Sequence, residues 1–229
     1  MRRKILAPCD GESGFTRNGA TRRIDSPGTL DTMGGMTPLD PVFSLPRYIF
    51  RRKVFTFLGA KFHVYDENWD VVMFSKKKAF KLKEDIRVFS DESQTKELLT
   101  VKARQILDFG ATYDVADSTT GAVVGSWHRK GLASILRDTW LCYDAQGNEI
   151  GKLIEDSMAK ALLRRFLLNL IPQGYSLQVD GKEAVTIHQH FNPFILRYTL
   201  DMTKHQGLLD PRLAISAGVL LCAIEGRQG

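Results

Sequence analysis

The sequence of 229 residues contains few cysteines and no long apolar run. Its three cysteines, Cys9, Cys142 and Cys222, are far apart and form no CxxC pair, so no disulfide framework is predicted. This favours a reducing compartment. No stretch reaches the roughly 18 apolar residues that a membrane-spanning helix needs, and the first residues show no signal-peptide pattern. We therefore expect a cytoplasmic protein without a transmembrane span.

The sequence also lacks the short motifs of common enzyme classes, since GxSxG, the P-loop and GxGxxG are all absent. His188 and His190 would lie on one face of a strand, but a metal site normally takes three or four protein ligands, and no sequence neighbour supplies the others. Cys222 lies within an apolar segment, where cysteine acts as a small hydrophobic residue. We predict no catalytic residue, no metal site, no cofactor and no enzymatic activity.

The formal net charge of +6 permits an acidic partner without requiring one. The chain has no motif in which aromatic and basic residues alternate, as in many nucleic-acid-binding domains, so no nucleic-acid partner is expected. Anionic phospholipid at a membrane surface remains the candidate partner, with peripheral membrane association as the matching localisation.

Residues 1–41 differ in composition from the rest of the chain. They are rich in Gly, Ser, Thr, Arg and Asp and show no apolar periodicity. We expect a flexible leader here, with Met33 and Met36 as alternative start positions, and a single domain over residues 42–229.

From Val54 onward the pattern is that of β-strands, and four segments share one arrangement. Each has a short β run, an aspartate, a tight polar or glycine turn and a second β run: HVYDENWDVVMF, YDVADSTTGAVVGSW, WLCYDAQGNEIGKL and LQVDGKEAVTIH. Aspartate and glycine favour tight turns, so these segments predict hairpins. The connections are too short for parallel crossovers, which makes an antiparallel sheet the expected topology.

Two segments break the β pattern. Residues 155–171 carry apolar side chains on one helical face and predict an amphipathic helix. Residues 211–225 predict a second helix, because Asp210 suits the N-cap and Pro211 the first helical position.

The second helix is apolar from Leu213 to Ile224 except at Ser216 and Gly218, so it must be surrounded on every side. A closed barrel formed by ten or more antiparallel strands would supply that surrounding wall. The chain is therefore expected to be mainly β, with this helix enclosed and with Ser216, Ala217 and Gly218 as points of close approach to the wall.

Three stretches resemble the tubby C-terminal-like superfamily, and within it the phospholipid scramblase and LURP-one-related branch. They are YDAQGNEIGKLIED, RRFLLNLIPQGYSLQVDGKEAVTIHQHF and RYTLDMTKHQGLLDPRLAISAGVLLCAIE. The resemblance covers about residues 45–229 and implies a barrel of about twelve strands around a hydrophobic C-terminal helix. It also implies a lipid-handling role or phosphoinositide binding, without a chemical reaction.

The chain departs from eukaryotic scramblases in the segment before the terminal helix. Those proteins carry an acidic, Ca²⁺-linked segment there, whereas DMTKHQGLLD contains only Asp201 and Asp210. Scrambling triggered by Ca²⁺ is therefore not expected.

Two groups of basic residues are candidates for binding anionic lipid. Lys76, Lys77, Lys78 and Lys81, together with Lys83, form the densest cluster, which alternatively is a solvated turn that protects a strand edge. Arg164 and Arg165 lie beside bulky apolar residues in the amphipathic helix, which alternatively covers one mouth of the barrel. The favoured function is non-enzymatic lipid binding at a membrane surface; the alternative is a soluble structural or interaction protein without a lipid function.

Overall fold

Strands form in this protein where short β-favouring runs are separated by turns that contain aspartate. The structure is a computed structural model that describes residues 38–53, 61–77, 85–105, 110–130, 139–156, 172–192, 194–205 and 207–224. Residues 1–37, which include most of the expected leader, lie outside this range, so the boundary near residue 41 remains a prediction.

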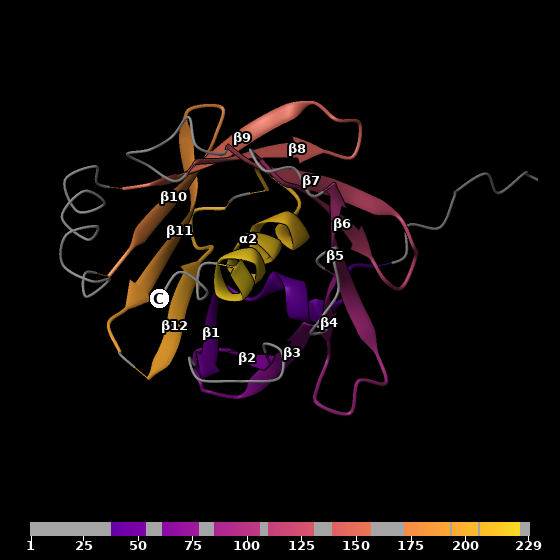
Figure 1. The fold of residues 1–229 in the computed structure, drawn as a ribbon, viewed down its shortest axis with the longest axis vertical. Helices are drawn as coiled ribbons and strands as arrows, with labels where there is room; N and C mark the ends of the chain where they lie inside the picture. The colour runs from indigo at the N-terminus through magenta and orange to yellow at the C-terminus, as the bar shows by residue number, and fades with distance from the viewer. Residues whose placement is uncertain are drawn as a thin grey trace, which may run out of the picture. The chain divides into compact units, whose positions relative to one another are not determined.

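Twelve strands form a closed antiparallel barrel in which each strand pairs with its neighbours along the chain and β1 pairs with β12 (Figure 1). The strands are β1 (Arg47–Lys53), β2 (Lys61–Tyr65), β3 (Val71–Lys77), β4 (Asp85–Phe89), β5 (Glu97–Gln105), β6 (Thr112–Asp117), β7 (Val123–Arg129), β8 (Thr139–Asp144), β9 (Glu149–Glu155), β10 (Gly174–Val179), β11 (Lys182–His190) and β12 (Ile195–Asp201). A short 3-10 helix, η1 (Pro41–Ser44), precedes β1, and helix α2 (Pro211–Ile224) follows β12. The predicted barrel is confirmed, and the four predicted hairpins are β2–β3, β6–β7, β8–β9 and β10–β11.

Aspartate side chains shape the connections at one end of the barrel. The carboxylate of Asp66 accepts the backbone N–H of Asn68, that of Asp144 accepts the N–H of Gln146, and that of Asp201 accepts the N–H of Thr203, each at 2.9 Å. Asp91 and Asp117 make the same contact two residues ahead. These Asx turns replace backbone hydrogen bonds that the chain loses where it reverses direction.

Helix α2 lies inside the barrel, surrounded by strands (Figure 1). All residues from Leu213 to Ile224 are buried, as expected for a helix that is apolar on every side. A carboxylate oxygen of Asp210 accepts the N–H of Arg212 at 2.9 Å, which confirms Asp210 as the N-cap. The predicted last residue of the helix, 225, lies outside the described residues.

Two polar or small residues of α2 meet the barrel wall closely, as predicted. The indole N–H of Trp127 on β7 donates to the hydroxyl of Ser216 at 2.9 Å, and that hydroxyl donates to the carbonyl of Leu213 at 2.7 Å. A Cβ atom added to Gly218 would lie 2.5 Å from the ring of Phe50 on β1. The interruptions in the apolar segment are therefore packing requirements.

The antiparallel order places alternate connections at opposite ends of the barrel. We call one the aspartate end; it holds the five hairpin turns that begin at or next to Asp66, Asp91, Asp117, Asp144 and Asp180, and the segment from Asp201 to the start of α2. We call the other the basic end; it holds the last residues of β1, β3, β5, β7, β9 and β11, the first residues of the strands that follow them, and the last described turn of α2.

The structure corrects two sequence-based expectations. The strands begin at Arg47 and not at Val54, because RYIFRRK forms β1 and directs Tyr48, Phe50 and Arg52 inward. The expected amphipathic helix cannot begin at Glu155, which is the last residue of β9; residues 157–171, the rest of that prediction, lie outside the described residues.

Candidate functional site

The predicted lipid-binding residues are only partly described by the structure. Lys76 is exposed near the end of β3, where its Cα partners are Lys61 on β2 and Arg87 on β4. Lys77 is the last residue of β3. Lys78, Lys81, Arg164 and Arg165 lie outside the described residues.

Strand order nevertheless relates the two predicted groups. The lysine cluster begins in the last two residues of β3 and continues into the connection to β4, and the arginine pair lies in the connection from β9 to β10. All four of these strand termini belong to the basic end. Two groups that are far apart in the sequence thus connect to strands at the same end of the barrel.

The described strand ends at the basic end carry many cations. Lys53, Lys61, Lys76 and Lys130 are exposed or half-exposed there. Three acidic residues of the described strand ends also lie there: Asp85 is ion-paired with Arg87 at 2.9 Å, Glu155 is buried with 3% of its surface exposed, and Asp156 is exposed.

The opposite end carries ionised carboxylates. Hydrogen bonds from Ser93 and from Asn148 lower the pKa of Asp91 and of Asp144 below the ordinary value. Burial alone would raise the pKa of Asp201, but hydrogen bonds from Thr203 and Arg47 outweigh burial and lower it. Among the described residues, ionised carboxylates thus gather at the aspartate end, where some are paired with arginine or lysine, and exposed lysines gather at the basic end.

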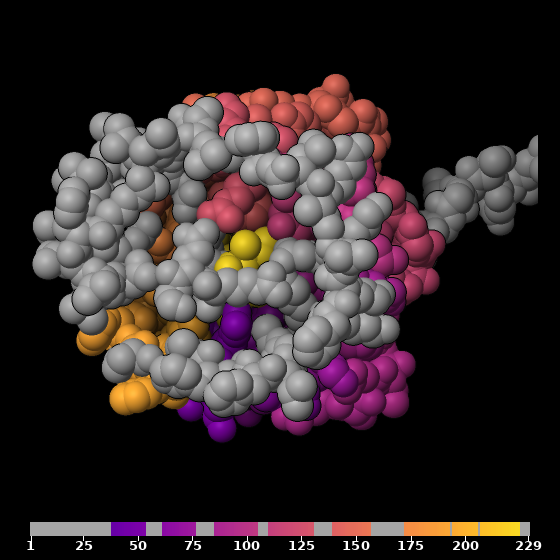
Figure 2. Space-filling model, viewed as in Figure 1, coloured from indigo at the N-terminus to yellow at the C-terminus, as the bar shows by residue number. Residues whose placement is uncertain are grey.

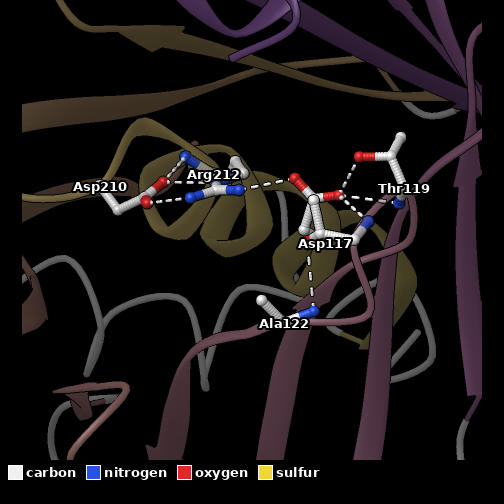
Figure 3. A network of polar contacts seen from close by, with 6 residues as sticks. Asp117, Thr119, Ala122, Asp210 and Arg212 are labelled. Atoms are coloured by element: carbon white, nitrogen blue, oxygen red, sulfur yellow. Dashed lines mark hydrogen bonds and ion pairs between the residues drawn. The ribbon is translucent and has the colours of Figure 1, made fainter. Parts of the chain in front are cut away.

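A polar network at the aspartate end fixes the start of α2 (Figure 3). The guanidinium of Arg212 lies between two carboxylates, at 2.6 Å from Asp117 and at 2.6 Å from Asp210. Asp117 also accepts hydrogen bonds from Thr119 and from the backbone N–H of Thr120. The charged groups of this network are hydrogen-bonded or ion-paired to one another, so the role of the network is to position the helix.

A second arginine holds the other end of α2. Arg52 lies on the inner face of β1 with 8% of its surface exposed, and its Nη1 donates to the carbonyl of Cys222 at 2.8 Å. This guanidinium meets the negative end of the helix dipole. Figure 2 shows atoms of α2 (yellow) at the centre of the face that it presents.

The remaining candidates for chemistry are inert or incomplete. Burial raises the pKa of the Cys142 thiol and of the Cys222 thiol to about 12, so neither forms a thiolate near neutral pH. The rings of His188 and His190 meet edge to face at 5.2 Å, and His190 also contacts the Thr199 hydroxyl at 2.8 Å. Within the described part of the chain, no three His, Cys, Asp or Glu side chains are grouped so that they could hold a metal ion.

Sequence reasoning missed four residues at the basic end. Phe191 and Phe194 are large apolar side chains with 55% and 68% of their surface exposed, and Arg51 and Arg197 are Cα partners on adjacent strands. The aromatic residues could have been found from the FNPF turn signal between two strands. The arginine pair depends on strand register, which short motifs do not reveal.

Comparison with known proteins supports the resemblance seen in the sequence. Residues 71–221, more than half of the chain, match the LURP-one-related family. No curated protein and no solved structure matches the chain. None of the helices in the described residues combines the length and the apolar character needed to cross a membrane.

Proposed function

This chain belongs to the LURP-one-related family, which is part of the tubby-like superfamily, and from this premise we propose that it is a non-enzymatic protein that binds anionic phospholipid. Binding takes place at a membrane surface through the basic end of the barrel. The protein is then cytoplasmic and associates with membranes peripherally. The observation that carries this proposal is the separation of charge between the two barrel ends.

Charge separation orients the barrel in front of an anionic bilayer. Each Lys or Arg near such a surface contributes about 1 kcal/mol of attraction, and the effect fades within a Debye length of about 8–10 Å. Lys53, Lys61 and Lys76 at the basic end are attracted, whereas Asp66, Asp144 and the other turn carboxylates are repelled and face away from the membrane.

The predicted lipid contacts are part of this proposal. Lys76 and Lys77 end β3, and Lys78 and Lys81 follow in the connection to β4. Arg164 and Arg165 lie in the connection from β9 to β10. Both groups follow strands that end at the basic end, so one bilayer surface can meet both.

Calcium is not expected to trigger binding. Asp201 accepts hydrogen bonds from Arg47 and Thr203, and Asp210 is ion-paired with Arg212, so both carboxylates already have cationic partners. Vesicle binding should be the same with Ca²⁺ and with a chelator.

Vesicle flotation tests the proposal. The full chain should float with vesicles of phosphatidylcholine and phosphatidylserine and should stay behind with phosphatidylcholine alone. Arg164→Glu with Arg165→Glu should weaken flotation. The matched control is Lys182→Glu with Lys204→Glu, which makes the same charge change at exposed lysines of the aspartate end.

Failure to float with either vesicle would contradict the proposal. It would favour the alternative, a soluble structural or interaction protein whose barrel is filled by α2. Equal weakening by the control pair would mean that net charge, and not the basic end, governs binding.

A further inference from the structure

Two neighbouring arginines at the basic end stand apart from the other arginines that the structure describes. The others have partners: Arg47 pairs with Glu67 and Asp201, Arg52 with carbonyls of α2, Arg87 with Asp85 and Glu97, Arg104 with Asp114, Arg129 with the Trp140 ring, and Arg212 with Asp117 and Asp210. Among the arginines of the described chain, Arg51 and Arg197 alone have no hydrogen bond or ion pair from their side chains. They are Cα partners across β1 and β12.

This arrangement is unfavourable for the isolated protein. Like charges directly opposite each other on adjacent strands repel and destabilise the sheet. The line of Cα partners that joins Arg51 on β1 to Arg197 on β12 continues to His190 on β11, which is the other Cα partner of Arg197. Burial and the nearby charges of Arg197 and His188 lower the pKa of His190, which keeps its imidazole neutral near pH 7. Lys53, exposed and two residues beyond Arg51, adds a further cation.

The connection from β11 to β12 lies at the same edge and exposes two phenylalanines. Phe191 follows His190 directly, and Phe194 precedes Ile195, the Cα partner of Lys53. The backbone there is held by Asn192, whose side-chain oxygen accepts the N–H of Phe194 and of Ile195, both at 2.9 Å. Two aromatic side chains held outward beside unpaired cations are an unusual surface for contact with water alone.

We propose that this surface is the membrane contact: Arg51 and Arg197 bind the phosphate of an anionic phospholipid headgroup, while Phe191 and Phe194 enter the boundary between headgroups and acyl chains. The inference rests on the proposed function and deepens it by naming the contact residues and the ligand chemistry. Paired guanidinium groups match phosphate oxygens geometrically, and bulky apolar residues next to cations are typical of interfacial membrane contacts.

Charge complementarity favours a bilayer as the occupant. The exposed Trp69, with 51% of its surface exposed, lies at the aspartate end among Asp66, Glu67 and Asp70, where an anionic surface is repelled. Phe191 and Phe194 instead lie next to Lys53, Arg51 and Arg197. The two exposed aromatic surfaces thus differ in the charges around them, which gives the experiment a matched control.

The test measures flotation of the full chain with vesicles of phosphatidylcholine and phosphatidylserine at several lipid concentrations. Arg51→Gln with Arg197→Gln should weaken binding by about ten-fold or more, since each cation near an anionic leaflet contributes measurably. Phe191→Ala with Phe194→Ala should weaken it to a similar extent. Trp69→Ala, and Lys182→Gln with Lys204→Gln, are the controls at the aspartate end and should bind like the unchanged protein.

A second measurement reports insertion directly. Phe194→Trp should gain fluorescence that is quenched by brominated acyl chains in anionic vesicles, relative to the unchanged protein. Inorganic phosphate tests whether the ligand is a lipid or a small anion. If the two arginines bind free phosphate instead of lipid, inorganic phosphate will bind the unchanged protein, and the Phe191→Ala, Phe194→Ala variant will float like the unchanged protein. That result would overturn the inference.

The outcomes separate the two proposals. If the unchanged protein floats and both double variants, shown to be folded by their thermal unfolding, float equally well, the contact surface is wrong and the proposed function stands. If the unchanged protein does not float, both are wrong. Loss of binding in both double variants supports the inference, provided that the controls are unaffected and that the added fluorescence of the Phe194→Trp variant is quenched.

Discussion

Asp117 and Arg212 meet where the chain enters the barrel, and their contact joins the β6–β7 turn to the first turn of α2. A cation near the start of a helix opposes the helix dipole, because the N-terminal end is itself positive. Asp117 and Asp210 offset this by surrounding the guanidinium with negative charge. The carboxylate of Asp117 is therefore needed for the position of the helix as much as for the turn.

Acid should release this contact. Burial alone would raise the pKa of Asp117, but hydrogen bonds from Thr119 and Arg212 lower it below its ordinary value of 3.8. Because the folded state holds this proton less tightly than the unfolded state, the contribution is present above pH 3.8 and is lost as pH falls through the lower folded value.

Asp117→Asn should thus lower the free energy of unfolding by about 1–3 kcal/mol at neutral pH. The free energy of unfolding of this variant should also decrease less steeply as pH falls, which urea unfolding at several pH values measures. An unchanged pH profile would show that other carboxylates dominate acid unfolding.

At the scale of the element, α2 is fitted to the wall of the barrel at individual atoms. A Cβ atom at Gly218 would lie 2.5 Å from two ring atoms of Phe50, a side chain with no exposed surface. The ring cannot move outward without moving β1. Glycine is retained here because of this contact, although it is a poor helix former.

Gly218→Ala should therefore destabilise the protein by about 1–3 kcal/mol through overpacking, despite the better helix propensity of alanine. Phe50→Leu removes ring atoms at the point of contact. It should therefore lower the free energy of unfolding by less in the Gly218→Ala variant than in the unchanged protein. Chemical denaturation of the two single variants and the double variant measures this coupling. Additive effects would contradict the proposed contact.

Much of the fold could be predicted from local patterns. The four aspartate-containing hairpins and the enclosed helix follow from turn chemistry and from an apolar segment with Asp210 before it, and these effects act within a few residues. Strand β1 was missed because RYIFRRK contains Arg52, whose inward position is compensated by carbonyls 170 residues away in the sequence.

The candidate site was harder to predict for the same reason. The lysine and arginine clusters can be seen in the sequence, but their common end depends on the order of all twelve strands. The pairing of Arg51 with Arg197 depends on the closure of the barrel between β1 and β12. Contacts between the first and last strands leave no local trace in a sequence.

At the scale of the whole molecule, closure leaves no strand edge for water to enter. The backbone amides of α2 are enclosed by the barrel and can exchange hydrogen only when the wall opens. Hydrogen–deuterium exchange followed by mass spectrometry should find the slowest peptides in Leu213–Leu221, slower than those of any hairpin turn. Faster exchange there than in the barrel strands would mean that the helix leaves the barrel without global unfolding.

The central place of α2 also has a consequence for how the protein is made. The helix follows all twelve strands in the chain, so the ribosome synthesises the wall before it synthesises the segment that fills it. Strands made at roughly 5–20 residues per second have an uncovered apolar inner surface until α2 emerges. The barrel can therefore complete its core only after α2 has left the ribosome, and until then its exposed strands are prone to aggregate.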